Sequence, residues 1–218
     1  MDLTHPHQSI ASVSSPNLPL LCGYLERQQA LYAILDAARD RRVREFLHTS
    51  QLPFLSLFEG LHAETLAEFA PYLTKLPSAH PFLEALVNHA WGNSWGVYCV
   101  SQHPAEAILA HLKKQIWAHT PNGRMLFRFY DPRVLREFLP VFNAKTAWEF
   151  FGPVDAFLME NEKGTALLRF TLGNEGAKLE AIALDCTEYP QPPPTSASFG
   201  ESNEDDGNWH ERPVTPIP

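Results

Sequence analysis

Two aspartates and two arginines are the residues of this sequence whose types and positions could support chemistry. Asp36 and Asp131 each follow an apolar run, and Arg128 and Arg133 flank Asp131. If both runs are strands, both aspartates lie at strand carboxyl ends, the edge where ligands bind in open α/β sheets. Two carboxylates and an arginine at that edge could hold a metal ion or a phosphoester. One hypothesis is therefore a metal-assisted phosphoesterase that uses Asp36 and Asp131.

The same residues also have a structural interpretation. Asp131 followed by Pro132 is typical of a helix start, because the carboxylate accepts backbone N–H groups and proline needs no such partner. If residues 124–130 form a strand, Arg128 lies in mid-strand on the same face as Tyr130. A guanidinium there must reach solvent or pair with a carboxylate, since an unpaired buried charge costs several kcal/mol. This interpretation, a cap and an ion pair at a strand-to-helix joint, is the one we favour.

No catalytic motif completes a site around these residues. The sequence has no glycine-rich phosphate loop, no HExxH, no GxSxG and no histidine close to the joint in sequence. The histidines lack metal-ligand spacing, and the HxH of His5 and His7 falls in a polar terminal segment. The three cysteines are widely spaced without CxxC pairing, which is typical of reduced thiols. The sequence predicts no catalytic residue, no metal ligand set and no cofactor.

The elements that must position the joint alternate between strand-like and helical patterns. Short apolar runs rich in aromatic residues predict strands at 31–36, 53–58, 94–101 and 124–130. Amphipathic patterns predict helices at 37–48, 63–70, 80–90 and 104–117. This alternation predicts an α/β body with a partly parallel sheet and flanking helices.

The pattern changes after a helical stretch at residues 131–151. Three strand-like runs, 153–160, 165–172 and 178–185, are separated by NEKG and GNEG, which are typical hairpin turns. They predict an antiparallel β-meander, in the same lobe or a second one. Earlier in the chain, Pro71 is expected to end a helix before a short edge strand. The aromatic stretch AWEFFGPVDAF, 147–157, either packs in the core or forms a groove for a partner.

Composition shifts divide the chain into three parts. Residues 1–28 are expected to form a flexible arm, 29–187 the folded α/β domain, and 188–218 an extended tail rich in proline and acids. With 44% hydrophobic and 11% aromatic residues the chain predicts a folded body. The amino terminus lacks the features of a signal peptide and no apolar run would span a membrane, so we expect a cytoplasmic protein.

The net charge of −8 is concentrated in the tail. Residues 185–218 contain seven acidic residues against Arg212 alone, which leaves about −2 for the rest of the chain. A nearly neutral body gives no electrostatic reason to expect nucleic-acid binding.

Several segments, in order and spacing, resemble one known family. These are LYAILDAARD, PFLSLFEG, LAEFAPYLTKL, WGVYCVS, LAHLKKQIWAHTPNGRMLFRFYDPRVLREFLPVF and FFGPV, covering about residues 30–160. They resemble the family called domain of unknown function 4123, and RFYDPRVL with the following FFGP is the most specific part. The resemblance implies a bacterial adaptor chaperone of the type VI secretion system, which binds a toxic effector and helps load it onto the VgrG spike without being an enzyme.

The family pattern falls on ten positions of this sequence. As the resemblance implies, each is a structural or partner-binding position: Asp36, Pro71, Tyr72, Arg128, Tyr130, Asp131, Pro132, Arg133, Phe151 and Gly152. The motif does not say which of them contact an effector. Besides the phosphoesterase, an immunity protein that neutralises a cognate toxin remains an alternative at this point.

Overall fold

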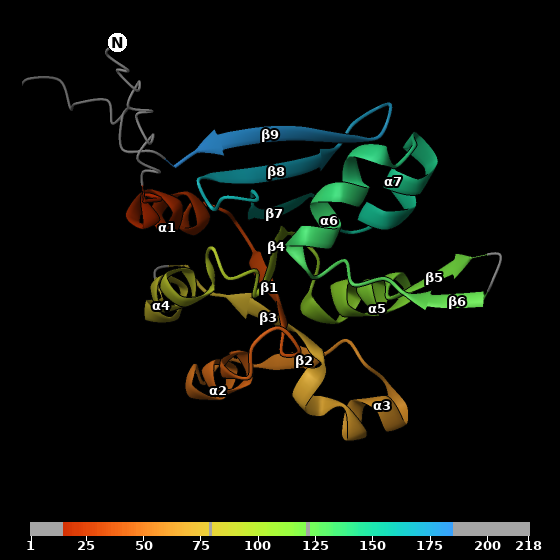
Figure 1. Ribbon diagram of the computed structural model, residues 1–218, viewed down its shortest axis with the longest axis horizontal. Coiled ribbons are helices and arrows are strands. Elements are labelled where there is room, and N and C mark those ends of the chain that lie inside the picture. Colours follow the sequence, from red (N-terminus) through yellow and green to blue (C-terminus); the bar gives the residue numbers. More distant parts are fainter. Residues whose placement is uncertain (1–14, 79, 121–122, 185–218) are drawn as a thin grey trace, which may run out of the picture. The chain divides into compact units, whose positions relative to one another are not determined.

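The computed structural model describes residues 15–78, 80–120 and 123–184. In these ranges seven strands form one sheet, in the order β2-β3-β1-β4-β7-β8-β9, and two more form a separate hairpin, β5-β6 (Figure 1). The strands of the sheet are β1 (Leu31–Asp36), β2 (Phe54–Ser56), β3 (Pro71–Leu76), β4 (Gly96–Val100), β7 (Ala156–Glu160), β8 (Ala166–Leu172) and β9 (Ala177–Ala183). The hairpin consists of β5 (Trp117–Thr120) and β6 (Gly123–Leu126).

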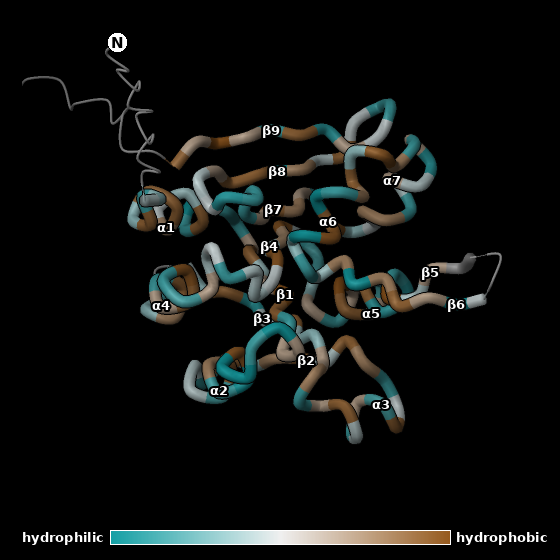
Figure 2. The backbone as a smooth tube through the Cα atoms, viewed as in Figure 1, coloured by the Kyte–Doolittle hydropathy of each residue, from teal (hydrophilic) through white to brown (hydrophobic). Residues whose placement is uncertain are grey.

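Helices cover both faces of the sheet. The α-helices are α1 (Leu18–Glu26), α2 (Arg42–Thr49), α3 (Gly60–Thr65), α4 (Pro81–Ala90), α5 (Ala105–Gln115), α6 (Pro132–Phe138) and α7 (Ala144–Phe151), with short 3-10 turns η1 (Ala67–Phe69) and η2 (Leu139–Val141). Residues of α1, α2 and α4 share one hydrophobic core, and residues of α5, α6 and α7 share the other (Figure 1). Hydropathy alternates along each helix, as expected when only one face meets a core (Figure 2).

Strand β1 is an interior strand, paired with β3 and β4, and its residues contribute to both cores. Leu31, Ala33 and Leu35 belong to the core under α1, α2 and α4, whereas Tyr32 and Ile34 belong to the opposite core. All six residues of the strand are buried. The side chains of successive residues alternate between faces, so a strand covered on both sides needs apolar residues at nearly every position.

Every neighbouring pair of strands in the sheet is antiparallel, so the expected partly parallel sheet is wrong. The physical reason lies in the double coverage of the sheet. Continuous apolar strands alternating with helices are typical of parallel sheets, but any sheet with helices on both faces produces the same pattern. The predicted meander of β7, β8 and β9 is confirmed, and it joins the same sheet through β4, so the described residues build one lobe.

Two local predictions also need correction. The strand expected at 124–130 ends at Leu126, so Arg128 lies in the loop that follows and not in mid-strand. The strand that begins at Pro71 was expected at an edge, yet β3 is paired on both sides, with β2 and with β1. Proline fits there because it is the first residue of the strand.

Helix α1 lies within the segment expected as a flexible arm, residues 1–28. Its N-cap Asn17 accepts a hydrogen bond from the Leu20 backbone N–H at 3.0 Å, and the Asn17 N–H donates to the Leu184 carbonyl at 2.7 Å. Leu21 and Leu25 are fully buried. Residues 18–26 are therefore part of the folded body, while 1–14 and the tail 188–218 lie outside the described residues.

Replacing Leu21 with alanine should destabilise the protein by about 2–5 kcal/mol, because it leaves a cavity beneath α1. Urea unfolding of the full chain measures the change. Glu26→Ala, an exposed change on the same helix, is the control and should stay within about 0.5 kcal/mol of the parent. Equal, small effects of the two changes would show that α1 does not contribute to the core.

Candidate functional site

The charged joint, defined as Asp36, Arg128, Tyr130, Asp131 and Arg133, is built around a buried carboxylate at the end of β1. The Asp36 side chain is 1% exposed, and its Oδ2 accepts a hydrogen bond from Arg128 Nη2 at 2.5 Å. Its Oδ1 accepts a hydrogen bond from the Ala38 backbone N–H at 3.0 Å. The guanidinium reaches Asp36 from the loop after β6 and is 38% exposed. The pair links two segments that are 92 residues apart in sequence.

The second carboxylate of the joint begins helix α6. Asp131 is the N-cap and Pro132 the first helical residue, as the sequence predicts. Asp131 Oδ1 accepts hydrogen bonds from the Arg133 backbone N–H at 3.0 Å and from Arg133 Nε at 2.9 Å, and Oδ2 accepts one from Nη2 at 2.6 Å. Asp131 does not follow a strand of the large sheet, so the expected pair of aspartates at strand carboxyl ends is not found.

The ionisation of these groups follows from burial and pairing. Burial raises the pKa of Asp36, and the hydrogen bond and charge of Arg128 oppose that shift. Burial also acts to raise the pKa of Asp131, but the hydrogen bonds from Arg133 outweigh it and the pKa is lowered. Burial, and then the charge of Asp36, raise the pKa of Tyr130 to about 12. Asp36 pairs with Arg128 and Asp131 pairs with Arg133, an arrangement typical of structural ion pairs.

The described residues do not supply the ligands that the phosphoesterase hypothesis needs. In the ranges 15–78, 80–120 and 123–184, no group of three or more histidine, cysteine, aspartate or glutamate residues could hold a metal ion. Burial raises the pKa of the Cys99 thiol to about 12, so this cysteine has no thiolate character.

A cluster of phenylalanines holds the joint from the side of α6 and α7. Phe127 and Phe129 come from the loop between β6 and α6, and both contact Phe150 of α7, with ring centroids 6.0 and 5.7 Å apart. Phe150 also lies 5.2 Å from Phe157 of β7, which joins the cluster to the sheet. Because Phe129 is fully buried, the loop that carries Arg128 is anchored on both sides of this residue.

The remaining residues of the family pattern lie at different places. Pro71 is the register partner of Asp36 across β1 and β3. Tyr72 is in the core on the other face of the sheet, where its hydroxyl donates to the Ala67 carbonyl at 2.6 Å. Phe151 and Gly152 end α7 beside the phenylalanine cluster, and Gly152 has a φ of 49°. The structure thus brings the joint together but leaves Tyr72 apart from it.

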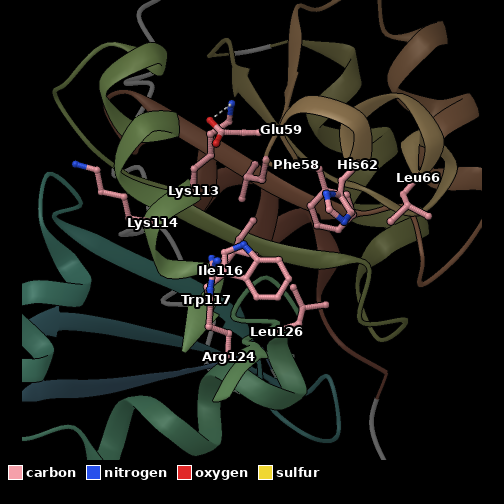
Figure 3. Close-up of a pocket in the computed structure, with 11 residues that line it drawn as sticks. Phe58, Glu59, His62, Leu66, Lys113, Lys114, Ile116, Trp117, Arg124 and Leu126 are labelled. Atoms are coloured by element: carbon pink, nitrogen blue, oxygen red, sulfur yellow. Dashed lines mark ion pairs between the residues drawn. The ribbon is translucent and has the colours of Figure 1, made fainter. Parts of the chain in front are cut away.

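A groove opens beside the joint, between α3 with its preceding loop on one side and α5 with the β5-β6 hairpin on the other (Figure 3). We call this the α3–hairpin groove, and its volume is about 670 Å³. Its apolar lining residues are Leu57, Phe58, Leu66, Ile116, Trp117 and Leu126. Its polar and charged lining residues are Glu59, His62, Lys113, Lys114 and Arg124.

Large apolar side chains remain accessible to solvent on both walls of the groove. Trp117 is 41% exposed and Leu126 is 38% exposed on the hairpin, facing Leu66, which is 38% exposed on the other wall. The Arg124 guanidinium lies over the Trp117 ring, 4.8 Å from its centroid. Exposed apolar groups that gather in one cavity are typical of binding sites rather than of general surface.

The loop after β6 connects the joint to the β5-β6 hairpin, which forms one wall of the groove. The Phe127 backbone N–H donates to the Ile116 carbonyl at 2.7 Å, so the hairpin is closed just before the loop that carries Arg128. The Arg128–Asp36 pair then ties that loop to β1. The loop between the hairpin and α6 is therefore bonded at one end to the residue before the hairpin and at Arg128 to β1.

Sequence reasoning missed both the groove and a third buried carboxylate, Glu160. The residues that line the groove come from separate segments, so no single stretch of the sequence indicates it. Glu160, at the end of β7, is buried, and its Oε1 accepts hydrogen bonds from the Ser94 backbone N–H at 3.0 Å and the Ser94 hydroxyl at 3.1 Å. Burial raises the pKa of Glu160, which anchors the loop before β4.

The fold and the site together define a mixed α/β domain with an internally braced charged joint and an open apolar groove. The chain belongs to the family described as Domain of unknown function (DUF4123), whose sequence profile matches residues 31–148. This range contains the joint and every residue that lines the groove, whereas Phe151 and Gly152 lie beyond it. No curated protein and no solved structure matches the chain in the corresponding searches. No helix in the described ranges is long and apolar enough to cross a membrane.

Replacing Arg128 with alanine should destabilise the protein by about 2–4 kcal/mol at pH 7, because a buried carboxylate loses its partner. Without Arg128 the pKa of Asp36 rises further, so the protonated form of the variant is favoured over a wider pH range. The deficit relative to the parent should therefore be largest at neutral pH and shrink as the pH falls toward about 4. Urea unfolding at several pH values measures both effects.

The double change Asp36→Asn with Arg128→Met is the control for this prediction. It removes both charges, so it should recover part of the stability that Arg128→Ala loses at pH 7. An Arg128→Ala protein as stable as the parent at every pH would contradict a structural role for the pair.

Replacing Gly152 with alanine should cost about 2–4 kcal/mol, since its φ of 49° disfavours a side chain and the new methyl would overlap the His111 ring. Gly60→Ala is the matched control, because Gly60 has a φ of 54° with nothing near its added methyl. Its cost in urea unfolding reports the backbone strain alone. Equal costs at the two positions would show that the His111 ring does not restrict this site.

Proposed function

We propose that this protein is an adaptor chaperone that binds a type VI secretion effector in the bacterial cytoplasm and helps load it onto the VgrG spike. The observation that carries the proposal is the α3–hairpin groove, an open apolar cavity within the family-matched part of the chain. The resemblance of the sequence motifs to an adaptor family gives the partner classes. The ion-paired joint supports a binding role rather than a catalytic one.

The chemistry of the groove suits a protein partner. Tryptophan and arginine are enriched among the residues that dominate binding energy at interfaces, and here Trp117 and Arg124 are stacked at the rim of an apolar cavity. A stable complex buries at least about 1,000 Å² in total, so the groove would form the centre of a larger contact.

In this proposal the family-pattern residues act indirectly. Asp36, Arg128 and Asp131 hold the loop after the hairpin, and the phenylalanine cluster supports that loop from α7. A change at the joint would alter partner binding by moving the hairpin wall. Changes within the groove would remove contact surface directly.

Co-purification with effectors encoded beside the gene tests the proposal. The parent protein should retain one effector, and Trp117→Ala should weaken that complex by about 30-fold, as expected for a central aromatic anchor. Trp148→Ala is the matched control, because Trp148 is 68% exposed on α7 and does not line the groove. Isothermal titration with the purified effector measures both. A well-folded parent that retains no effector would contradict the proposal.

The same complex separates loading from immunity. An adaptor carries the effector without abolishing its toxic activity, whereas an immunity protein protects cells that express the isolated toxin domain. Protection of such cells would replace the adaptor proposal with the immunity alternative.

A further inference from the structure

We infer that the α3–hairpin groove takes an acidic amphipathic segment of a partner protein, with its apolar side chains inserted in the cavity and its carboxylates beside Lys114 and Arg124. The inference rests on the proposed function only in taking a partner protein as the occupant. It adds the chemical character of the segment that is recognised.

The charges that line the groove set the sign of the ligand. Lys113 lies 3.1 Å from Glu59, so these two residues offset one another. Lys114 and Arg124 form no ion pair with another described residue. The groove therefore has a local charge of about +2 on a protein whose net charge is −8. Carboxylates are attracted to this position, whereas most of the negative charge of the chain lies in residues 185–218.

The position of Arg124 makes this charge part of the apolar site. Its guanidinium is stacked over the Trp117 ring, which limits its freedom and keeps its N–H groups at the rim. A carboxylate that pairs with Arg124 would thus lie beside an apolar side chain on Trp117. Figure 3 shows Trp117, Arg124 and Leu126 on one side of the cavity and His62 and Leu66 across from them.

An exposed apolar side chain beside the cavity favours a polypeptide over a small molecule. Leu61, next to the lining residue His62 on α3, is 71% exposed and does not line the cavity itself. A segment bound in the groove would extend over α3 and cover Leu61, as amphipathic segments do in other apolar grooves. Two unpaired cations are too few for the phosphate contacts of a nucleic acid.

Two synthetic peptides of about 15 residues, with leucine and phenylalanine at the same positions and either glutamate or lysine elsewhere, serve as probes. They are titrated into the full-length ¹⁵N-labelled protein while the indole signals of its five tryptophans are recorded. Trp117→Phe assigns the relevant signal. The glutamate peptide should shift the Trp117 signal and bind at least about tenfold more tightly than the lysine peptide at low salt, the effect of two exposed charge pairs.

Charge reversal gives the decisive comparison. Lys114→Glu with Arg124→Glu should invert the preference between the peptides, whereas Arg41→Glu with Arg44→Glu, the same charge change on and beside α2, should leave it unchanged. Equal binding of both peptides, an unshifted Trp117 signal, or an unchanged preference in the groove variant would overturn the inference.

Two further results separate this inference from related ones. Neutralising Glu204, Asp205 and Asp206 as Gln, Asn and Asn should leave peptide affinity unchanged. An increase above about tenfold would make the acidic tail of this chain the occupant and overturn the inference of a partner segment. If the peptides fail while an effector co-purifies, the proposed function stands and the groove inference falls. If the peptides bind while no effector co-purifies, the groove inference stands and the proposed function falls.

Discussion

The buried carboxylate of Asp36 is the constraint on which the arrangement around the groove depends. It ends β1, an interior strand of a sheet that is covered on both faces, so water cannot solvate its charge and the protein must supply a partner. That partner, Arg128, comes from the loop after the β5-β6 hairpin. The ion pair therefore does more than neutralise a charge. It links β1 to the loop that follows a hairpin outside the large sheet, with 2.5 Å between Arg128 Nη2 and Asp36 Oδ2.

The phenylalanine cluster complements this pair because it acts on the same loop without directional bonds. Phe127 precedes Arg128 and Phe129 follows it, and Phe150 of α7 contacts both rings. An ion pair with a half-exposed guanidinium is sensitive to solvent, whereas ring packing is not. Together they hold the loop in one conformation, with Asp131 starting α6 immediately afterwards. The turn at Gly152 lets α7 end against His111 of α5. Helix α5, which leads directly into the β5-β6 hairpin, therefore packs against the end of α7.

How much of this could be predicted from the sequence depends on how local each cause is. The Asp131 cap and the hairpins of β7, β8 and β9 depend on adjacent residues, and both predictions are confirmed. Sequence reasoning left two possibilities for Arg128, exposure to solvent or pairing with a carboxylate, and the pairing with Asp36, 92 residues away, depends on the tertiary fold. Strand direction failed because burial on both faces hides it from the apolar pattern. The groove could not be predicted at all, since its two walls come from segments separated by α4 and β4 and only the fold brings them together.

An open groove leaves apolar side chains exposed to water, and this cost is a reason to expect contacts that keep its walls apart. Side chains such as Trp117, Leu66 and Leu126 gain little stability where they are, because each keeps more than a third of its surface in water. Burial of apolar area contributes about 25 cal/mol per Å², so a collapse of the hairpin onto α3 would be favourable unless something opposed it. The Arg128–Asp36 pair and the phenylalanine cluster oppose it by holding the loop after the hairpin to the sheet. A cavity kept open in this way leaves its apolar area accessible, and in the proposed function a partner would bind there without the cost of first separating the walls.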